Sequence, residues 1–166
     1  MKIQRTITLD ASSEHVWHIL ANRFHDVGEW ATIINVSERL KTQTGGAGVA
    51  DRVCDTPDGI FKEQVTSFDE QARTFSYVAY EGLPGFVRKG GNTWGVRAVG
   101  RGKTEVHMCM EFDLNPIADV LMGWMLKRQM GKAADGVLAD LKVYAETGEV
   151  SESKRAALAK HAKKAA

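Results

Sequence analysis

The chain has 166 residues, of which 43% are hydrophobic and 26% are charged, a composition typical of one soluble globular domain. Its 22 basic and 21 acidic residues leave a net charge of +1, which argues against broad capture of nucleic acid because that requires a strongly basic face. No apolar run approaches the roughly 20 residues that span a bilayer, and the N-terminus lacks the apolar core of a signal peptide. We therefore expect a cytoplasmic protein with no nucleic-acid partner and no stable membrane insertion.

The first part of the chain predicts a strand followed by short helices. Ile3, Ile7 and Leu9 alternate with polar residues, which is typical of a half-buried strand. Residues 10–14 then supply the capping oxygens and the acidic first turn of a helix. A second short helix or turn is expected over residues 23–27.

Six further strands are predicted, separated by short turn sequences such as Pro57-Asp58-Gly59. Connections this short favour a meander, in which consecutive strands pair. The last strand has the clearest pattern, because apolar residues occupy every second position and the other face is exposed to solvent. The predicted strands are Ile33–Lys41, Gly48–Asp55, Ile60–Phe68, Thr74–Tyr80, Asn92–Val99 and Thr104–Asp113.

A long helix is predicted to follow the sheet. Asn115 ends the last strand, and Pro116 is well suited to a first helical turn. Apolar residues then recur at intervals of three and four, so that the helix extends to about Glu146, with Gly148 as its C-terminal cap. Three glycines within it each cost about 1 kcal/mol relative to alanine. Close approach to the sheet or room for a ligand would offset that cost.

This order of elements predicts an α+β fold, in which one long helix lies on a curved antiparallel sheet. We assign residues 1–147 to this domain and residues 148–166 to a polar, basic tail that is able to form a helix. Residues 151–166 contain five basic side chains and one acidic side chain, a net charge of +4. A solvated terminal helix is a better interpretation of this low charge density than a surface for nucleic acid or anionic membranes.

Several short motifs occur in the order found in one known superfamily. Residues 11–17 resemble its first helix opening, Trp30 matches the tryptophan that follows, and residues 82–85 (Gly-Leu-Pro-Gly) resemble the gate loop of plant abscisic-acid receptors. Further likenesses lie at residues 48–52, 58–59, 63–65, 68–69, 75–77, 102–106, 112 and 116. Together they resemble the START-like (SRPBCC) superfamily, the polyketide cyclase/dehydrase and lipid-transport group, over roughly residues 2–147. No latch motif follows the gate, which argues against a hormone receptor with a phosphatase partner.

The resemblance implies a helix-grip fold: a seven-stranded antiparallel sheet curved around the C-terminal helix, with two short helices after the first strand and a cavity between sheet and helix. Small-molecule sites are usually apolar pockets with a few convergent polar groups. Any single inward side chain is also explained as part of the hydrophobic core. Only the resemblance to the superfamily favours a cavity. The candidate ligand-binding residues are Arg52, Phe61, Glu63, Tyr77, Trp94 and Met108 on strands, Leu83, Pro84 and Phe86 on the loop, and Leu121, Trp124 and Met125 on the long helix.

The polar candidates leave alternatives open. Arg52 and Glu63 occupy inward positions, where an unpaired charge is costly, so they pair with each other, or Arg52 holds a ligand carboxylate or phenolate. Tyr77 donates a hydrogen bond to a ligand carbonyl or caps a buried acceptor. The glycine-rich segment Glu81–Asn92 is a lid that closes over a ligand or an ordinary long hairpin. His25 is a less favoured candidate for a general base at the pocket.

No cofactor or metal is expected, because the chain has no zinc-ligand spacing, nucleophile elbow, Walker loop or Rossmann fingerprint. Cys54 and Cys109 fit neither a disulfide framework nor a metal cluster. We therefore expect a carrier or sensor that binds a hydrophobic or aromatic small molecule, lipid- or polyketide-like. The alternatives are an aromatase/cyclase-like enzyme acting on a polyketide-like or phenolic substrate, and a module whose loop at residues 83–87 docks a partner protein. No residue is assigned a catalytic role.

Overall fold

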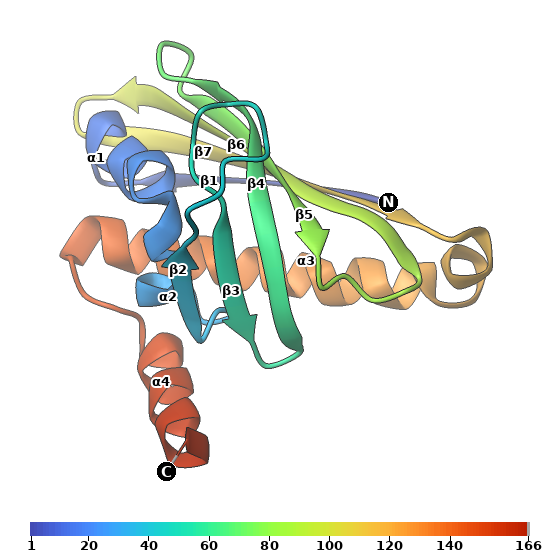
Figure 1. Ribbon diagram of the computed structural model, residues 1–166. Helices are drawn as coiled ribbons and strands as arrows, with labels where there is room; N and C mark the ends of the chain where they lie inside the picture. Colours follow the sequence, from blue (N-terminus) through green and yellow to red (C-terminus); the bar gives the residue numbers. More distant parts are fainter. Residues whose placement is uncertain (166) are drawn as a thin grey trace.

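The computed structural model describes residues 1–165, and the side chains of residues 1–163. Its elements follow the predicted order (Figure 1). The strands are β1 (Lys2–Leu9), β2 (Val36–Arg39), β3 (Arg52–Thr56), β4 (Gly59–Asp69), β5 (Thr74–Glu81), β6 (Val87–Gly100) and β7 (Lys103–Leu114). The helices are α1 (Ser13–Trp17), η1 (His18–Asn22), η2 (Phe24–Asp26), α2 (Val27–Trp30), α3 (Pro116–Thr147) and α4 (Glu152–Ala165).

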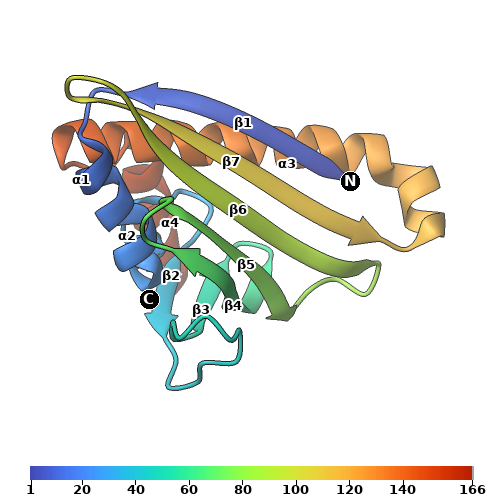
Figure 2. The same ribbon diagram turned by 90° about the horizontal axis from the view of Figure 1, so that it is seen from above.

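The seven strands form one antiparallel sheet in the order β1-β7-β6-β5-β4-β3-β2. Strands β2 to β7 are a meander, and β1 closes the sheet beside β7. Helix α3 runs along β1 and β7, and the short helices lie beside its C-terminal half (Figure 2). The predicted helix-grip fold is therefore confirmed, including the short helices that follow the first strand.

The register brings large apolar side chains into rows on the concave face of the sheet. Phe75 pairs with Trp94, and Trp94 pairs with Met108, so that one row crosses β5, β6 and β7. These three side chains are at most 4% exposed. Leu141 of α3 is fully buried and belongs to the same hydrophobic core. The core thus lies between the sheet and the second half of α3.

The ends of α3 are set by local sequence, as predicted. The Asn115 side chain accepts a hydrogen bond from the Ala118 amide at 2.8 Å, and Pro116 occupies the first turn. Gly148 adopts φ 74°, a left-handed conformation that costs glycine nothing, and caps the C-terminus. Within the helix, a Cβ on Gly131 would lie 3.0 Å from Nη2 of Arg5. That atom is the far end of a flexible side chain, so close approach to the β1 backbone does not explain this glycine.

Several boundaries differ from the sequence-based expectation. Strand β2 covers only Val36–Arg39 and not the predicted Ile33–Lys41. Strand β6 begins at Val87 instead of Asn92, because Val87 pairs with Leu114 and continues the ladder. The adjacent glycines at 90 and 91, which ordinarily weaken a strand, are held here by partners on both sides. The loop before β6 is therefore residues 82–86 and not the long hairpin of Glu81–Asn92. Strand β3 begins at Arg52, and the preceding segment is a loop in which the buried Asp51 carboxylate accepts a hydrogen bond from the Thr44 amide at 3.0 Å.

The C-terminal helix α4 lies below α2 in Figure 1 and is anchored to the domain by a buried lysine. Lys154 is fully buried, and its Nζ donates to the carbonyl oxygens of Ala31 at 3.1 Å and Ile34 at 2.6 Å. The hydroxyl of Ser151 donates to Asp140 of α3 at 2.5 Å. The sequence predicts a solvated terminal helix, whereas the structure buries one side chain of this helix, Lys154, against the domain. None of the helices within residues 1–165 is long and apolar enough to cross a membrane.

Candidate functional site

A pocket of about 510 Å³, called the inner pocket below, lies between the concave face of the sheet, the short helices and α3. This volume is within the usual range for sites that hold a small organic ligand. Its apolar walls include Leu20 and Phe24 from the short helices, Phe61, Trp94 and Met108 from the sheet, and Met130 from α3.

Small residues on the sheet leave part of this space open. Ala79 of β5 pairs with Gly90 of β6, and both line the inner pocket. A Cβ on Gly90 would lie 3.3 Å from Phe112 and 3.4 Å from Leu83. A larger side chain at Ala79 would therefore project into the inner pocket, whereas one at Gly90 would press against Phe112 and Leu83.

The inner pocket brings together eight of the twelve candidate residues. Arg52, Phe61, Glu63, Tyr77, Leu83, Pro84, Trp94 and Met108 line it. Phe86 does not line it. Its carbonyl oxygen accepts a hydrogen bond from the Asn115 amide at 2.9 Å, which ties the loop to the start of α3. Whether any of these side chains touches a ligand stays a prediction.

The expectation that Leu121, Trp124 and Met125 face the pocket is wrong. Leu121 is 73% exposed and Trp124 is 71% exposed, on the side of α3 that points away from the sheet. The buried side of this half of the helix carries small residues, Ala118 and Gly123. The first half of α3 has apolar residues on two sides. The 3.6-residue period identified the side with the larger side chains, and that side faces outward. The side chains from α3 that do line the inner pocket include Met130, Ala133 and Val137.

Arg52 and Glu63 form an ion pair beneath the inner pocket. Nε of Arg52 donates to Oε2 of Glu63 at 2.5 Å, and the two side chains are only 5% and 9% exposed. The Arg52 guanidinium also donates to the Phe24 carbonyl and lies 3.8 Å from the centroid of the Phe24 ring. The Tyr77 ring lies on it as well, with 4.9 Å to the centroid. Of the two alternatives, the structure shows the internal pair, in which the arginine charge already has its partners.

Cys54 lies beside this pair and is not a nucleophile. Its Sγ is 3.7 Å from Oε2 of Glu63. Burial raises the pKa of the Cys54 thiol to about 12, against the opposing effect of the Arg52 charge. Since the thiolate is the reactive form, this cysteine is inert near neutral pH.

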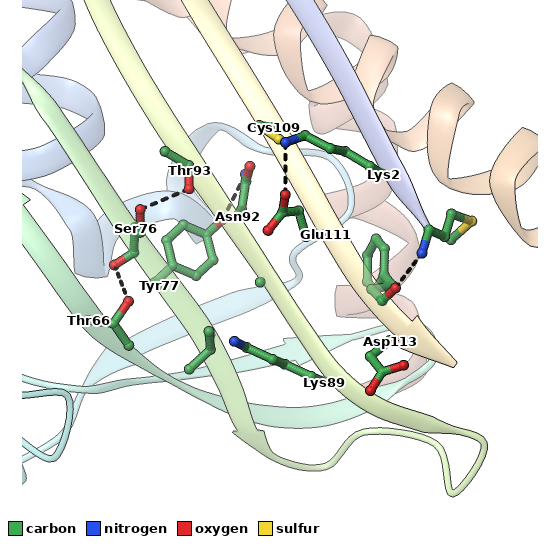
Figure 3. Close-up of a pocket in the computed structure, with 14 residues that line it drawn as sticks. Lys2, Thr66, Ser76, Tyr77, Lys89, Asn92, Thr93, Cys109, Glu111 and Asp113 are labelled. Atoms are coloured by element: carbon green, nitrogen blue, oxygen red, sulfur yellow. Dashed lines mark hydrogen bonds and ion pairs between the residues drawn. The ribbon is translucent and has the colours of Figure 1, made fainter. Parts of the chain in front are cut away.

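Tyr77 and Asn92 form a second polar group on the wall of the inner pocket. Nδ2 of Asn92 donates to the Tyr77 hydroxyl oxygen at 3.3 Å, as Figure 3 shows. Burial raises the pKa of the Tyr77 phenol, so that the group is neutral and keeps its proton. Oδ1 of Asn92 is buried, and no hydrogen-bond donor reaches it within the described residues. Sequence reasoning missed Asn92, although it lies in phase with the inward Trp94.

His25 is not part of the site. Its Nε2 lies 2.9 Å from the carbonyl oxygen of Ala50, and the residue does not line the inner pocket. Burial lowers the pKa of His25, while the Ala50 carbonyl opposes this effect. The hypothesis of a general base at the pocket is therefore not supported, because His25 does not line the inner pocket.

The opposite face of the sheet carries a second hollow of about 530 Å³, the outer pocket, drawn in Figure 3. Several of its polar groups pair with one another: Lys2 pairs with Glu111 at 2.9 Å, and the Ser76 and Thr93 hydroxyls are 2.8 Å apart. Tyr77 and Asn92 line this hollow as well as the inner pocket. The outer pocket offers little apolar surface to a ligand. The inner pocket is therefore the candidate site.

The curved sheet, the long helix across it and the pocket between them are those of the helix-grip fold, which a START superfamily protein of known structure shares. The family model described as polyketide cyclase/dehydrase and lipid transport matches residues 1–146. The chain belongs to this family.

Solved structures share the fold at low sequence identity. A START superfamily protein from Mycobacterium smegmatis is 16% identical, with a TM-score of 0.73 over 89% of this chain and 99% of that one. An uncharacterised protein from Bacillus thuringiensis is 20% identical, with a TM-score of 0.67 over 86% and 96%. The di-domain aromatase/cyclase BexL is 14% identical, with a TM-score of 0.65 over 87% of this chain and 47% of that one. None of the curated proteins matches the chain.

Proposed function

We propose that this protein binds one apolar or aromatic small molecule in the inner pocket and acts as a cytoplasmic carrier or sensor. The observation that carries the proposal is a pocket of about 510 Å³ with mainly apolar walls, whose buried charges neutralise each other. An apolar ligand gains about 25 cal/mol for each Å² of apolar surface removed from water. A pocket of this kind therefore binds without an ionic anchor.

The loop at residues 82–86 supports ligand enclosure more than the docking of a protein partner. Leu83 lines the inner pocket and is half-buried, close to Gly90. The Gly82 backbone lies against β4, where an added Cβ would meet the Ile60 carbonyl oxygen at 2.1 Å. This contact fixes one end of the loop, and the hydrogen bond from Asn115 to Phe86 fixes the other.

A cyclase-like activity is the second candidate, favoured by the family description and by the Tyr77 phenol on the pocket wall. As the enol carbon of a folded polyketone attacks a second carbonyl group, a neutral phenol can protonate the alkoxide oxygen that forms and recover a proton from the enol hydroxyl. The Arg52–Glu63 pair is less suited to this role because each charge is engaged by the other. Turnover of a poly-β-ketone substrate by the purified protein, lost in Tyr77→Phe, would favour the enzyme.

Native mass spectrometry of the purified full chain tests the carrier proposal directly. We expect a stoichiometric apolar adduct, identified after extraction, or a thermal shift with lipids or polycyclic aromatics. Ala79→Leu should abolish binding by filling the inner pocket, whereas Trp124→Ala, on the exposed side of α3, should leave it intact. A clean apo mass combined with no thermal shift across such a panel would exclude this function.

A further inference from the structure

The inner pocket presents one free hydrogen-bond acceptor beside one free donor. Oδ1 of Asn92 has no donor among the described residues, although the side chain is only 8% exposed. The Tyr77 oxygen accepts from Nδ2 of Asn92, and the Tyr77 hydroxyl proton has no acceptor within the described part of the chain. A buried polar atom left without a partner is costly, and native structures normally supply one. Tyr77 and Asn92 line the inner pocket as well as the outer pocket, so a molecule bound in the inner pocket lies next to both side chains.

The same pocket is poorly suited to an anionic head group. Among the described residues, its cations are Arg52 and Arg23, and both are engaged. Arg52 is held by the Glu63 carboxylate, the Phe24 carbonyl and the ring of Phe24. Arg23 is paired with Asp26 and Glu29. A ligand carboxylate would have to displace Glu63 and leave that charge buried without its partner, which is strongly unfavourable. Asn92 Oδ1 would also repel an anion.

We infer that the ligand is neutral and presents a hydroxyl group, as an alcohol, phenol or enol, to Tyr77 and Asn92. A ligand hydroxyl donates to Oδ1 of Asn92 and accepts from the Tyr77 hydroxyl, so it pairs with both unpaired groups at once. A ketone or ether can satisfy only Tyr77, and a hydrocarbon satisfies neither. This inference rests on the proposed function and adds the chemical class of the ligand. Sites built to bond a hydroxyl discriminate against analogues that lack it, because their own polar groups remain unpaired.

The test is a series of probes on one apolar scaffold, with affinity followed by pyrene fluorescence near neutral pH. 1-Hydroxypyrene donates and accepts, 1-acetylpyrene only accepts, pyrene does neither, and pyrene-1-carboxylate is anionic. We expect 1-hydroxypyrene to bind roughly 10- to 100-fold more tightly than the other three probes. The Asn92→Leu variant should lose this preference while its unfolding temperature is kept or raised, because the substitution removes an unpaired buried acceptor.

Thr93→Val is the matched control, because Thr93 is the next residue of β6, exposed on the opposite face. It should retain the preference for the hydroxyl probe. Equal binding of pyrene and 1-hydroxypyrene, blocked by Ala79→Leu, would overturn the inference and leave the proposed function standing. Tightest binding of the carboxylate would also overturn it. If none of the four probes binds, and decanol and decane fail as well, both the inference and the proposed function are excluded.

Discussion

Arg52 of β3 and Glu63 of β4 are directly paired in the sheet register, and their side chains meet at 2.5 Å on its buried face. The pair therefore connects two neighbouring strands at the base of the inner pocket. A buried ion pair of this kind stabilises the fold only while both members are present, because either charge alone remains buried without compensation.

The first prediction concerns this pair. Glu63→Leu should lower the free energy of unfolding by about 3–5 kcal/mol, because it leaves the Arg52 charge buried. The double variant Arg52→Met, Glu63→Leu should recover most of that loss. Urea unfolding of the wild type, both single variants and the double variant gives the coupling energy. Additive losses in the double variant would show that the two charges act independently.

The second prediction concerns the anchor of α4. Lys154→Met should lower the free energy of unfolding by about 1–3 kcal/mol, because the Ile34 carbonyl loses its 2.6 Å donor. The Ala31 carbonyl keeps a second donor in the Ile34 amide. The exposed Lys160→Met on the same helix is the control, and it should change stability by less than about 0.5 kcal/mol. Equal effects of the two substitutions would mean that α4 is not held by Lys154.

The same lysine should also respond to pH. Burial lowers the pKa of folded Lys154 below 10.5, opposed by Asp140, so the unfolded chain binds more protons in the window just below 10.5. Stability contributed by this group therefore rises with pH through that window. We expect the difference in unfolding free energy between wild type and Lys154→Met to grow between neutral pH and about pH 10. A constant difference would indicate an ammonium group with an ordinary pKa.

Much of the fold could be predicted because strand alternation and helix caps are encoded by residues close together in the sequence. Alternation identified β7, and the caps Asn115 and Gly148 were read directly from the sequence. The start of β6 was missed because Gly90 and Gly91 have low strand propensity, and only pairing with both neighbouring strands keeps them in the ladder.

The site was predicted less completely, since orientation on α3 depends on packing partners that the sequence does not show. The first half of this helix is apolar on two sides, and the larger residues, including Trp124, face outward. The sequence pattern places Asn92 at the first position of a strand, where a polar residue is ordinary and by itself gives no signal of a site. Its phase with Trp94 and Val96 was the available signal, since polar residues at inward positions often serve a site.

Acid stability provides a test of His25. Because burial lowers the pKa of folded His25 below the ordinary 6.5, the unfolded chain binds more protons as the pH falls through 6.5. Its contribution to stability is therefore complete above that value and lost below it. The His25→Gln variant, which keeps a donor for the Ala50 carbonyl, should lack this dependence. Chemical unfolding from about pH 5 to about pH 7.5 should show the wild-type advantage shrinking with acid. Parallel curves would show that His25 titrates normally.

The final prediction contrasts two tryptophans that the sequence placed in one site. Trp94 is 4% exposed and lines the inner pocket, so Trp94→Ala should cost about 3–5 kcal/mol of stability and change ligand affinity. Trp124 is 71% exposed, so Trp124→Ala should change stability by less than about 0.5 kcal/mol and leave affinity unaltered. Thermal unfolding and ligand titration of both variants provide the measurements. A large loss of affinity in Trp124→Ala alone would mean that the outer side of α3, and not the inner pocket, contacts the ligand.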